Sequence, residues 1–72
     1  MIENKKTLFI PDTGVQIVYV KEEGETFGSI EIQKTKIDNS ESEIVIDLDF
    51  FVDEDTVLMI RDFFIKVSNE WI

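Results

Sequence analysis

The sequence predicts an α+β domain: a four-stranded antiparallel meander followed by one C-terminal helix packed on one face of the sheet. Three observations lead to this fold class. Runs of β-branched and aromatic residues are separated by short turns that contain Gly or Pro, residues 43–52 carry an apolar side chain at every second position, and residues 54–70 contain neither Pro nor Gly. Because short turns join strands that are neighbours in space, the strands should pair in sequence order. We expect residues 1–72 to form a single two-layer domain.

The first three strands are expected at residues 6–10, 15–20 and 26–37. Pro11 and Gly14 favour a turn after the first strand, since proline presets φ and glycine tolerates a positive φ. A second turn surrounds another glycine, which lies among glutamates.

The third strand does not keep one apolar parity. Ile30 and Ile32 share a face by period two, whereas Phe27 and Ile37 have the opposite parity. This pattern predicts a bulge near Gly28 or strand ends that separate from the sheet.

The fourth strand, residues 43–52, follows a polar loop at 38–42 and has the clearest alternation in the chain. One set of side chains should face the core: Ile44, Ile46, Leu48, Phe50 and Val52. The other set should face outward: Glu43, Val45, Asp47, Asp49 and Phe51.

The helix is expected at residues 54–70. Asp53 suits the N-cap, and Glu54 and Asp55 suit the first turn, where carboxylates interact favourably with the helix dipole. At 100° per residue, six apolar side chains fall within about 120° of the helix circumference. We call them the main stripe and expect it to lie on the sheet: Val57, Ile60, Phe63, Phe64, Val67 and Trp71.

Leu58, Ile65 and Ile72 form a second stripe with seven-residue spacing on a different side of the helix. Either the sheet wraps the helix widely enough to reach these residues, or they pair with another chain, because this spacing suits helix–helix contact. Trp71 is expected to close the end of the core, and Tyr19 fits either sheet face.

Composition excludes several kinds of chemistry. The chain has no cysteine and no histidine, so it has no disulfide, thiolate nucleophile, Cys/His zinc site or imidazole base. Its net charge of -9 should repel nucleic acid and anionic membranes. We expect no secretory signal and no membrane span, and the lack of cysteine makes the cytoplasm the expected location.

The negative charge is concentrated in the second half of the chain. Residues 1–36 carry a net charge of -1 and residues 37–72 a net charge of -8. We expect a partner-binding surface here, with Phe51 as an apolar anchor among the acids. Its residues would be Glu43, Asp47, Asp49, Phe51, Asp53, Glu54 and Asp55. The alternative is a solvated face that only keeps a small apolar protein soluble.

Metal binding and catalysis are weaker interpretations. The acids between Asp47 and Asp55 superficially resemble a calcium loop, but the glycine at the turn and the bidentate glutamate are missing. Asp47 and Asp49 are the only plausible acid–base pair, and an open strand face would leave them solvated. We therefore expect no enzyme activity, no metal and no cofactor.

These observations favour a small cytoplasmic protein that binds another protein. The leading hypothesis is an acidic inhibitor or decoy, of the type made by phages and mobile elements, that mimics nucleic acid and occludes a basic surface of a larger protein. The rival is an assembly module, a homodimer or small subunit held together through Leu58, Ile65 and Ile72 or through the open sheet face.

Overall fold

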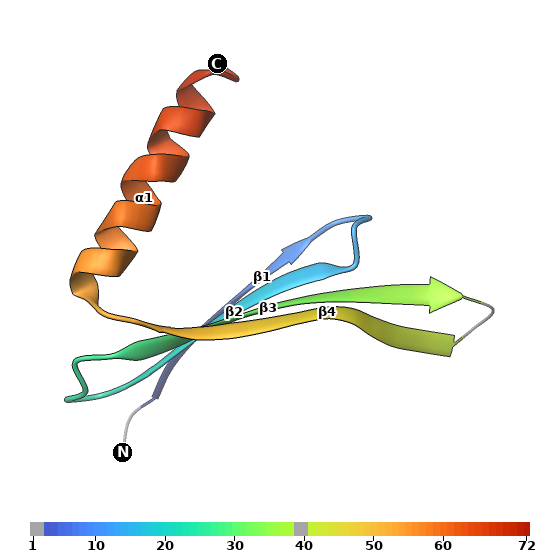
Figure 1. Cartoon of the computed structure of the whole chain (residues 1–72), viewed down its shortest axis with the longest axis horizontal. Helices are drawn as coiled ribbons and strands as arrows, with labels where there is room; N and C mark the ends of the chain where they lie inside the picture. The colour runs from blue at the N-terminus through green and yellow to red at the C-terminus, as the bar shows by residue number, and fades with distance from the viewer. Residues whose placement is uncertain (1–2, 39–40) are drawn as a thin grey trace.

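The computed structural model describes residues 3–38 and 41–72. Four strands, β1 (Glu3–Ile10), β2 (Val15–Glu22), β3 (Gly28–Asp38) and β4 (Glu41–Val52), form one antiparallel sheet in the order β1-β2-β3-β4. A single helix, α1 (Glu54–Asn69), follows β4 (Figure 1). The predicted fold class and strand order are confirmed. β1, β2 and β4 extend two or three residues beyond the predicted bounds, whereas β3 begins two residues later than predicted. The predicted loop at 38–42 is wrong at residues 38, 41 and 42, which belong to strands, and residues 39–40 lie outside the described residues.

The turn between β1 and β2 is tied to β3. Gly14 has φ +72°, and its carbonyl oxygen accepts a hydrogen bond of 2.9 Å from the backbone N–H of Thr35. A Cβ at Gly14 would come within 2.2 Å of the Thr35 carbonyl oxygen. Glycine is therefore required here both for its positive φ and for the close approach of two backbones. Asp12 also has a positive φ, of 65°, which the sequence did not indicate.

One irregularity interrupts the β3–β4 ladder. Lys34 pairs with Ile46 and Thr35 with Ile44, so Val45 is an extra residue in β4. A bulge of this kind changes the parity of the strand. The predicted alternation therefore holds from Ile46 to Val52 but not before it. The bulge lies in the fourth strand, and not near Gly28 where the third-strand pattern had suggested one.

The helix begins where the sequence predicts. Asp53 is the N-cap, and its side chain accepts a hydrogen bond of 2.9 Å from the backbone N–H of Thr56. The backbone N–H of Val57 donates to the Asp53 carbonyl oxygen at 3.0 Å. The cap satisfies backbone donors that the first helical turn would otherwise leave unpaired.

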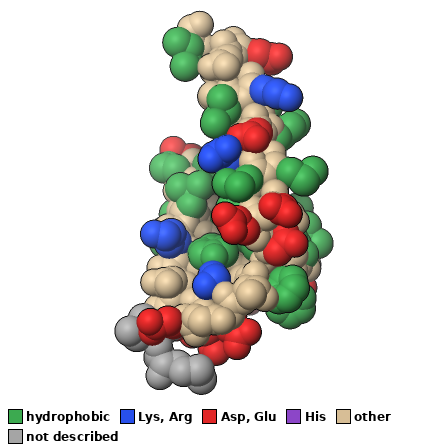
Figure 2. All heavy atoms as spheres, turned by 90° about the vertical axis from the view of Figure 1, so that its left-hand side faces the viewer, with side chains coloured by type: hydrophobic (Ala, Val, Ile, Leu, Met, Phe, Trp, Pro, Cys, Tyr) green, Lys and Arg blue, Asp and Glu red, His purple; other side chains and the backbone are tan. Residues whose placement is uncertain are grey.

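The helix does not lie on the sheet, which differs from the expected two-layer packing. Figure 1 shows it leaving the end of β4 and pointing away from the strands, and α1 contains no buried residue. In Figure 2 the helix rises as a narrow column with hydrophobic side chains along it. Among the described residues, Val52 is the only buried apolar side chain, with 3% of its surface exposed.

The connection between strand and helix explains this position. Only Asp53 separates Val52, the last residue of β4, from Glu54, the first of α1. Its backbone is extended, with φ -101° and ψ -179°, and its side chain is held by the cap. A helix that folds back across its own sheet needs a chain reversal, for which connections usually provide about two to six residues.

Candidate protein-binding surfaces

Strand pairing separates the sheet into two unlike faces. Alternate residues point to opposite faces, and directly paired residues point to the same face. The register joins Leu8 with Ile17, Ile17 with Ile32 and Ile32 with Leu48 in one continuous row. We call this side the apolar sheet face. Its apolar residues are Leu8, Ile10, Val15, Ile17, Tyr19, Ile30, Ile32, Ile46, Leu48, Phe50 and Val52.

Much of the apolar sheet face is open to solvent. Leu8, Ile46 and Leu48 are each more than half exposed. These side chains form rows across all four strands, so they make one continuous surface. Isolated exposed apolar residues are ordinary on monomeric proteins, whereas large continuous apolar patches are rare on them and are typical of binding sites or of surfaces prone to aggregation.

The opposite side of the sheet is acidic. We call it the acidic sheet face, and its acids are Glu3, Glu22, Glu31, Asp47 and Asp49. Only one lysine, Lys5, lies on this side of the four strands. Four of the chain's six lysines lie on the apolar sheet face instead: Lys6, Lys21, Lys34 and Lys36. Most lysines of the sheet therefore lie opposite the five acids. The separation is incomplete, because Glu41 and Glu43 lie on the lysine side and the acidic sheet face also carries exposed apolar side chains such as Phe9.

Glu31 is a member of this acidic cluster that the sequence did not single out. It pairs directly with Asp49, while Gln33 pairs with Asp47. Like charges in direct cross-strand positions repel each other. Glu3 and Glu22 form a second pair of this kind. Only the register reveals these neighbours, because each pair lies about 18 residues apart in the sequence.

The structure divides the predicted partner-binding residues into three groups. Asp47, Asp49 and Phe51 lie together on the acidic sheet face, and Phe51 is 82% exposed. Glu43 lies beyond the bulge and pairs with Lys36, on the side of the apolar face. The bulge separates Glu43 from the acids that the simple alternation had grouped with it.

The third group is at the start of the helix: Asp53, Glu54 and Asp55. The hydrogen bond from Thr56 lowers the pKa of the Asp53 carboxyl below its ordinary value. This carboxylate already acts as the helix cap, so it has a structural role besides any role in binding. Figure 2 shows acidic side chains gathered where the helix meets the sheet.

Both helix stripes are largely exposed. Phe63 and Phe64 of the main stripe are each 60% exposed, and their rings pack edge to face with centroids 5.2 Å apart. Trp71 is 85% exposed, so the prediction that it closes the core is wrong: the helix carries it away from the sheet. In the second stripe, exposure rises from Leu58 at 37% through Ile65 at 49% to the terminal Ile72.

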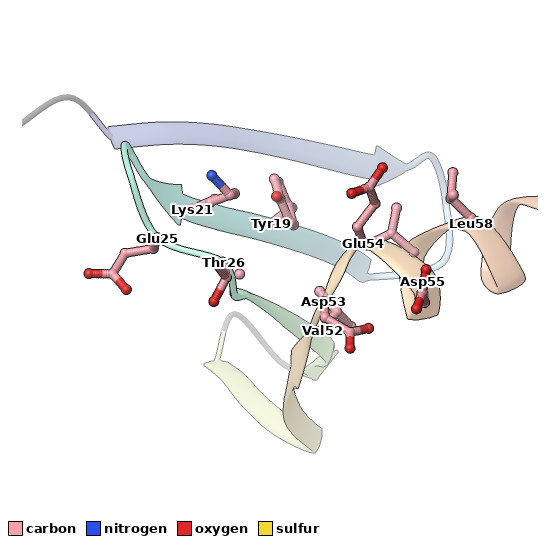
Figure 3. Close-up of a pocket in the computed structure, with 11 residues that line it drawn as sticks. Tyr19, Lys21, Glu25, Thr26, Val52, Asp53, Glu54, Asp55 and Leu58 are labelled. Atoms are coloured by element: carbon pink, nitrogen blue, oxygen red, sulfur yellow. The ribbon is translucent and has the colours of Figure 1, made fainter.

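A hollow of about 640 Å³ lies between the first turn of α1 and the apolar sheet face. Figure 3 shows Tyr19 and Lys21 projecting from β2, Glu54 at the start of the helix and Leu58 further along it, and all four line the hollow. The Tyr19 ring lies so close to Gly28 that a Cβ there would come within 2.7 Å of it. Tyr19, which the sequence assigned to neither face, thus belongs to the apolar sheet face.

Other kinds of site find little support in the described part of the chain. Within residues 3–38 and 41–72, no three carboxylates gather closely enough to hold a metal ion, and α1 is neither long nor apolar enough to cross a membrane. The only salt bridge that the structure describes joins Arg61 to its neighbour Asp62, at 2.9 Å. Among residues 3–38 and 41–72, the acids of the sheet therefore have no ion-pair partner.

Comparison of the chain with protein-family models, with curated proteins and with solved structures found no match.

Proposed function

We propose that this chain acts by binding a protein with a basic surface, as a small acidic inhibitor or decoy that occludes a nucleic-acid-handling site. The observation that carries the proposal is the separation of charge across the sheet. Five acids lie on one face with a single lysine, and no described ion pair neutralises them.

The acidic sheet face has the features of a binding surface. Directly paired residues such as Glu31 and Asp49 have Cβ atoms about 5 Å apart, and Asp47 lies about 7 Å along the strand from Asp49. Such rows of negative charge resemble those that nucleic acid presents to a basic groove. Phe51 lies at the edge of the rows and supplies an apolar anchor. Repulsion within the rows costs stability, which a basic partner would offset.

The proposed mechanism is occlusion. The charged face steers the chain to a basic groove, and its bulk then blocks access of nucleic acid, so association should be fast and should weaken as salt rises. The chain's own negative charge keeps it off nucleic acid itself. We place this binding in the cytoplasm, because the chain contains no cysteine. The phage or mobile-element origin remains part of the hypothesis.

The test is displacement of labelled duplex DNA from a panel of purified basic DNA-binding proteins. We expect the wild-type chain to displace DNA from at least one member. The triple variant Glu31→Gln, Asp47→Asn, Asp49→Asn should bind that member at least about 10-fold more weakly and with a smaller salt dependence.

The matched control removes three acids from the turns instead: Asp12→Asn, Glu23→Gln and Glu25→Gln. Asparagine tolerates the positive φ of Asp12. Both variants change the net charge equally, so only the location of the charge differs. Equal affinity of the two variants would contradict binding through the acidic sheet face, and failure to displace DNA from any member would contradict the decoy function.

A second candidate function is an assembly module. It is favoured by the exposure of the apolar sheet face and of the main stripe in the same chain. The two functions are compatible, because the acidic sheet face lies on the other side of the sheet and stays open when the apolar side is covered.

A further inference from the structure

We propose that two copies of this chain form a dimer by exchanging helices: the main stripe of each α1 packs on the apolar sheet face of the other copy. This contact gives the assembly function a definite partner and geometry. The acidic sheet face takes no part in it, so decoy activity and dimerisation can fail independently.

The exposed area of the single chain is larger than that of a compact monomer of the same mass. A compact monomer of 8.4 kDa exposes about 4,600 Å², whereas this chain exposes 6370 Å². Its radius of gyration is 14.7 Å, against about 11 Å expected for a compact domain of this length. The excess lies in the apolar sheet face and the helix stripes, which are the surfaces that a second copy would cover.

The excess of exposed area is similar to the area that homodimer interfaces bury. Each chain exposes about 1,750 Å² more than a compact monomer, so burying it in both copies removes about 3,500 Å² in total. Obligate homodimers bury about 2,000 to 5,000 Å² in all, through interfaces that resemble a protein core. One symmetric interface, made of two equivalent helix–sheet contacts, is thus large enough to account for all of the excess.

The chain itself carries both halves of this core. The helix has 16 residues and is about 24 Å long, and β4 has 12 residues and is about 40 Å long. The helix therefore fits within the length of the sheet. Phe63 and Phe64 supply aromatic anchors, and Ile32 and Leu48 lie in the row that would receive them.

The short connection between β4 and α1 keeps the helix off its own sheet, so the helix is free to pack on the sheet of a second copy. Asp53 is the only residue between β4 and α1, and it is extended and capped, so the helix projects away from its own sheet. Short connections of this kind favour exchange of an element between identical chains. The hollow between the first helical turn and the apolar sheet face leaves space on the side from which the partner's helix would approach.

The first experiment measures mass and contacts on the unmodified full chain. Sedimentation equilibrium at micromolar concentration should give twice 8.4 kDa, also in high salt, because the contact is apolar. In a mixture of isotope-labelled and unlabelled chains, NMR should detect contacts between chains that join the Phe63 and Phe64 rings to Ile32 and Leu48 methyl groups. A monomer would overturn the proposal, and so would a dimer whose contacts involve only strand edges or only Leu58 and Ile65.

The second experiment uses complementation. Phe64→Asp damages the helix stripe and Ile32→Asp damages the sheet face, and each should raise the dimer dissociation constant by about 30-fold or more. Mixing the two variants restores one intact contact, between the helix of one chain and the sheet of the other. We expect dimer and folded signal to reappear only in the mixture, even if each variant alone is unfolded. No recovery in the mixture would overturn helix exchange.

Discussion

Strand β2 and helix α1 are both rich in apolar residues, but they differ in how far those residues are buried. Seven of the eight residues of β2 are half-buried, because β1 and β3 flank the strand on both edges. In α1 no residue is buried, because only the start of the helix lies near the sheet. The comparison shows that an apolar pattern specifies what an element can bury. Whether that surface is buried depends on the neighbours that the chain connections allow.

The largest expected loss of stability comes from a substitution that tests whether the apolar sheet face is covered in solution. Ile32→Asp should abolish cooperative folding of the isolated variant, because a charge without a partner in a covered apolar surface costs about 3 kcal/mol or more. The adjacent change Gln33→Asp, on the acidic sheet face, should retain the sheet at a smaller cost, which comes from repulsion by Asp47 and loss of the hydrogen bond from Gln16. Urea unfolding followed by circular dichroism measures both. If the two variants were equally stable, the apolar sheet face would be open to water.

The second effect concerns the turn that ties β1 and β2 to β3. Gly14→Ala should destabilise the sheet by about 1–3 kcal/mol, because it combines a strained positive φ with a clash against Thr35. Gly24→Ala is the matched control: Gly24 also has a positive φ, but a Cβ there meets nothing within 4 Å. Denaturant midpoints compare the two, and equal losses would show that the Thr35 contact contributes nothing.

A third prediction uses pH to test the stability of the helix apart from that of the sheet. The pKa of Asp53 is lowered in the folded chain, so its cap contributes fully above the unfolded pKa, near 3.8. The stabilisation by the cap is lost as the pH falls through the lower pKa that Asp53 has in the folded chain. Helical circular dichroism at 222 nm should therefore fall below about pH 4. Asp53→Asn keeps a cap that does not titrate, and an unchanged acid transition in that variant would assign the loss to other carboxyls.

The smallest effect probes repulsion on the acidic sheet face. Glu31→Gln should stabilise the sheet by about 0.2–1 kcal/mol at low salt, because it removes the like charge opposite Asp49. The gain should shrink as salt screens the pair. Glu23→Gln, in the turn between β2 and β3, provides the control. Thermal unfolding at two salt concentrations measures the difference, and a loss of stability would contradict repulsion.

Local patterns accounted for most of the fold. The glycine turns, the alternation from Ile46 to Val52 and the cap at Asp53 were all predictable, because each depends on residues close together in the sequence. The residues that share each sheet face could not be predicted in this way. Glu31 joins Asp49 through pairing between strands, and one bulge residue, Val45, moves Glu43 to the other side. The register follows from turn geometry and from pairing between strands, which the alternation within one strand does not show.

The sequence by itself determined the elements, their order and the presence of two apolar surfaces that require cover. Only the tertiary structure decided that these surfaces do not cover each other within one chain. The physical reason is the connection at Asp53: a single extended, capped residue gives the backbone no room to reverse, so α1 leaves the sheet whose apolar face it matches.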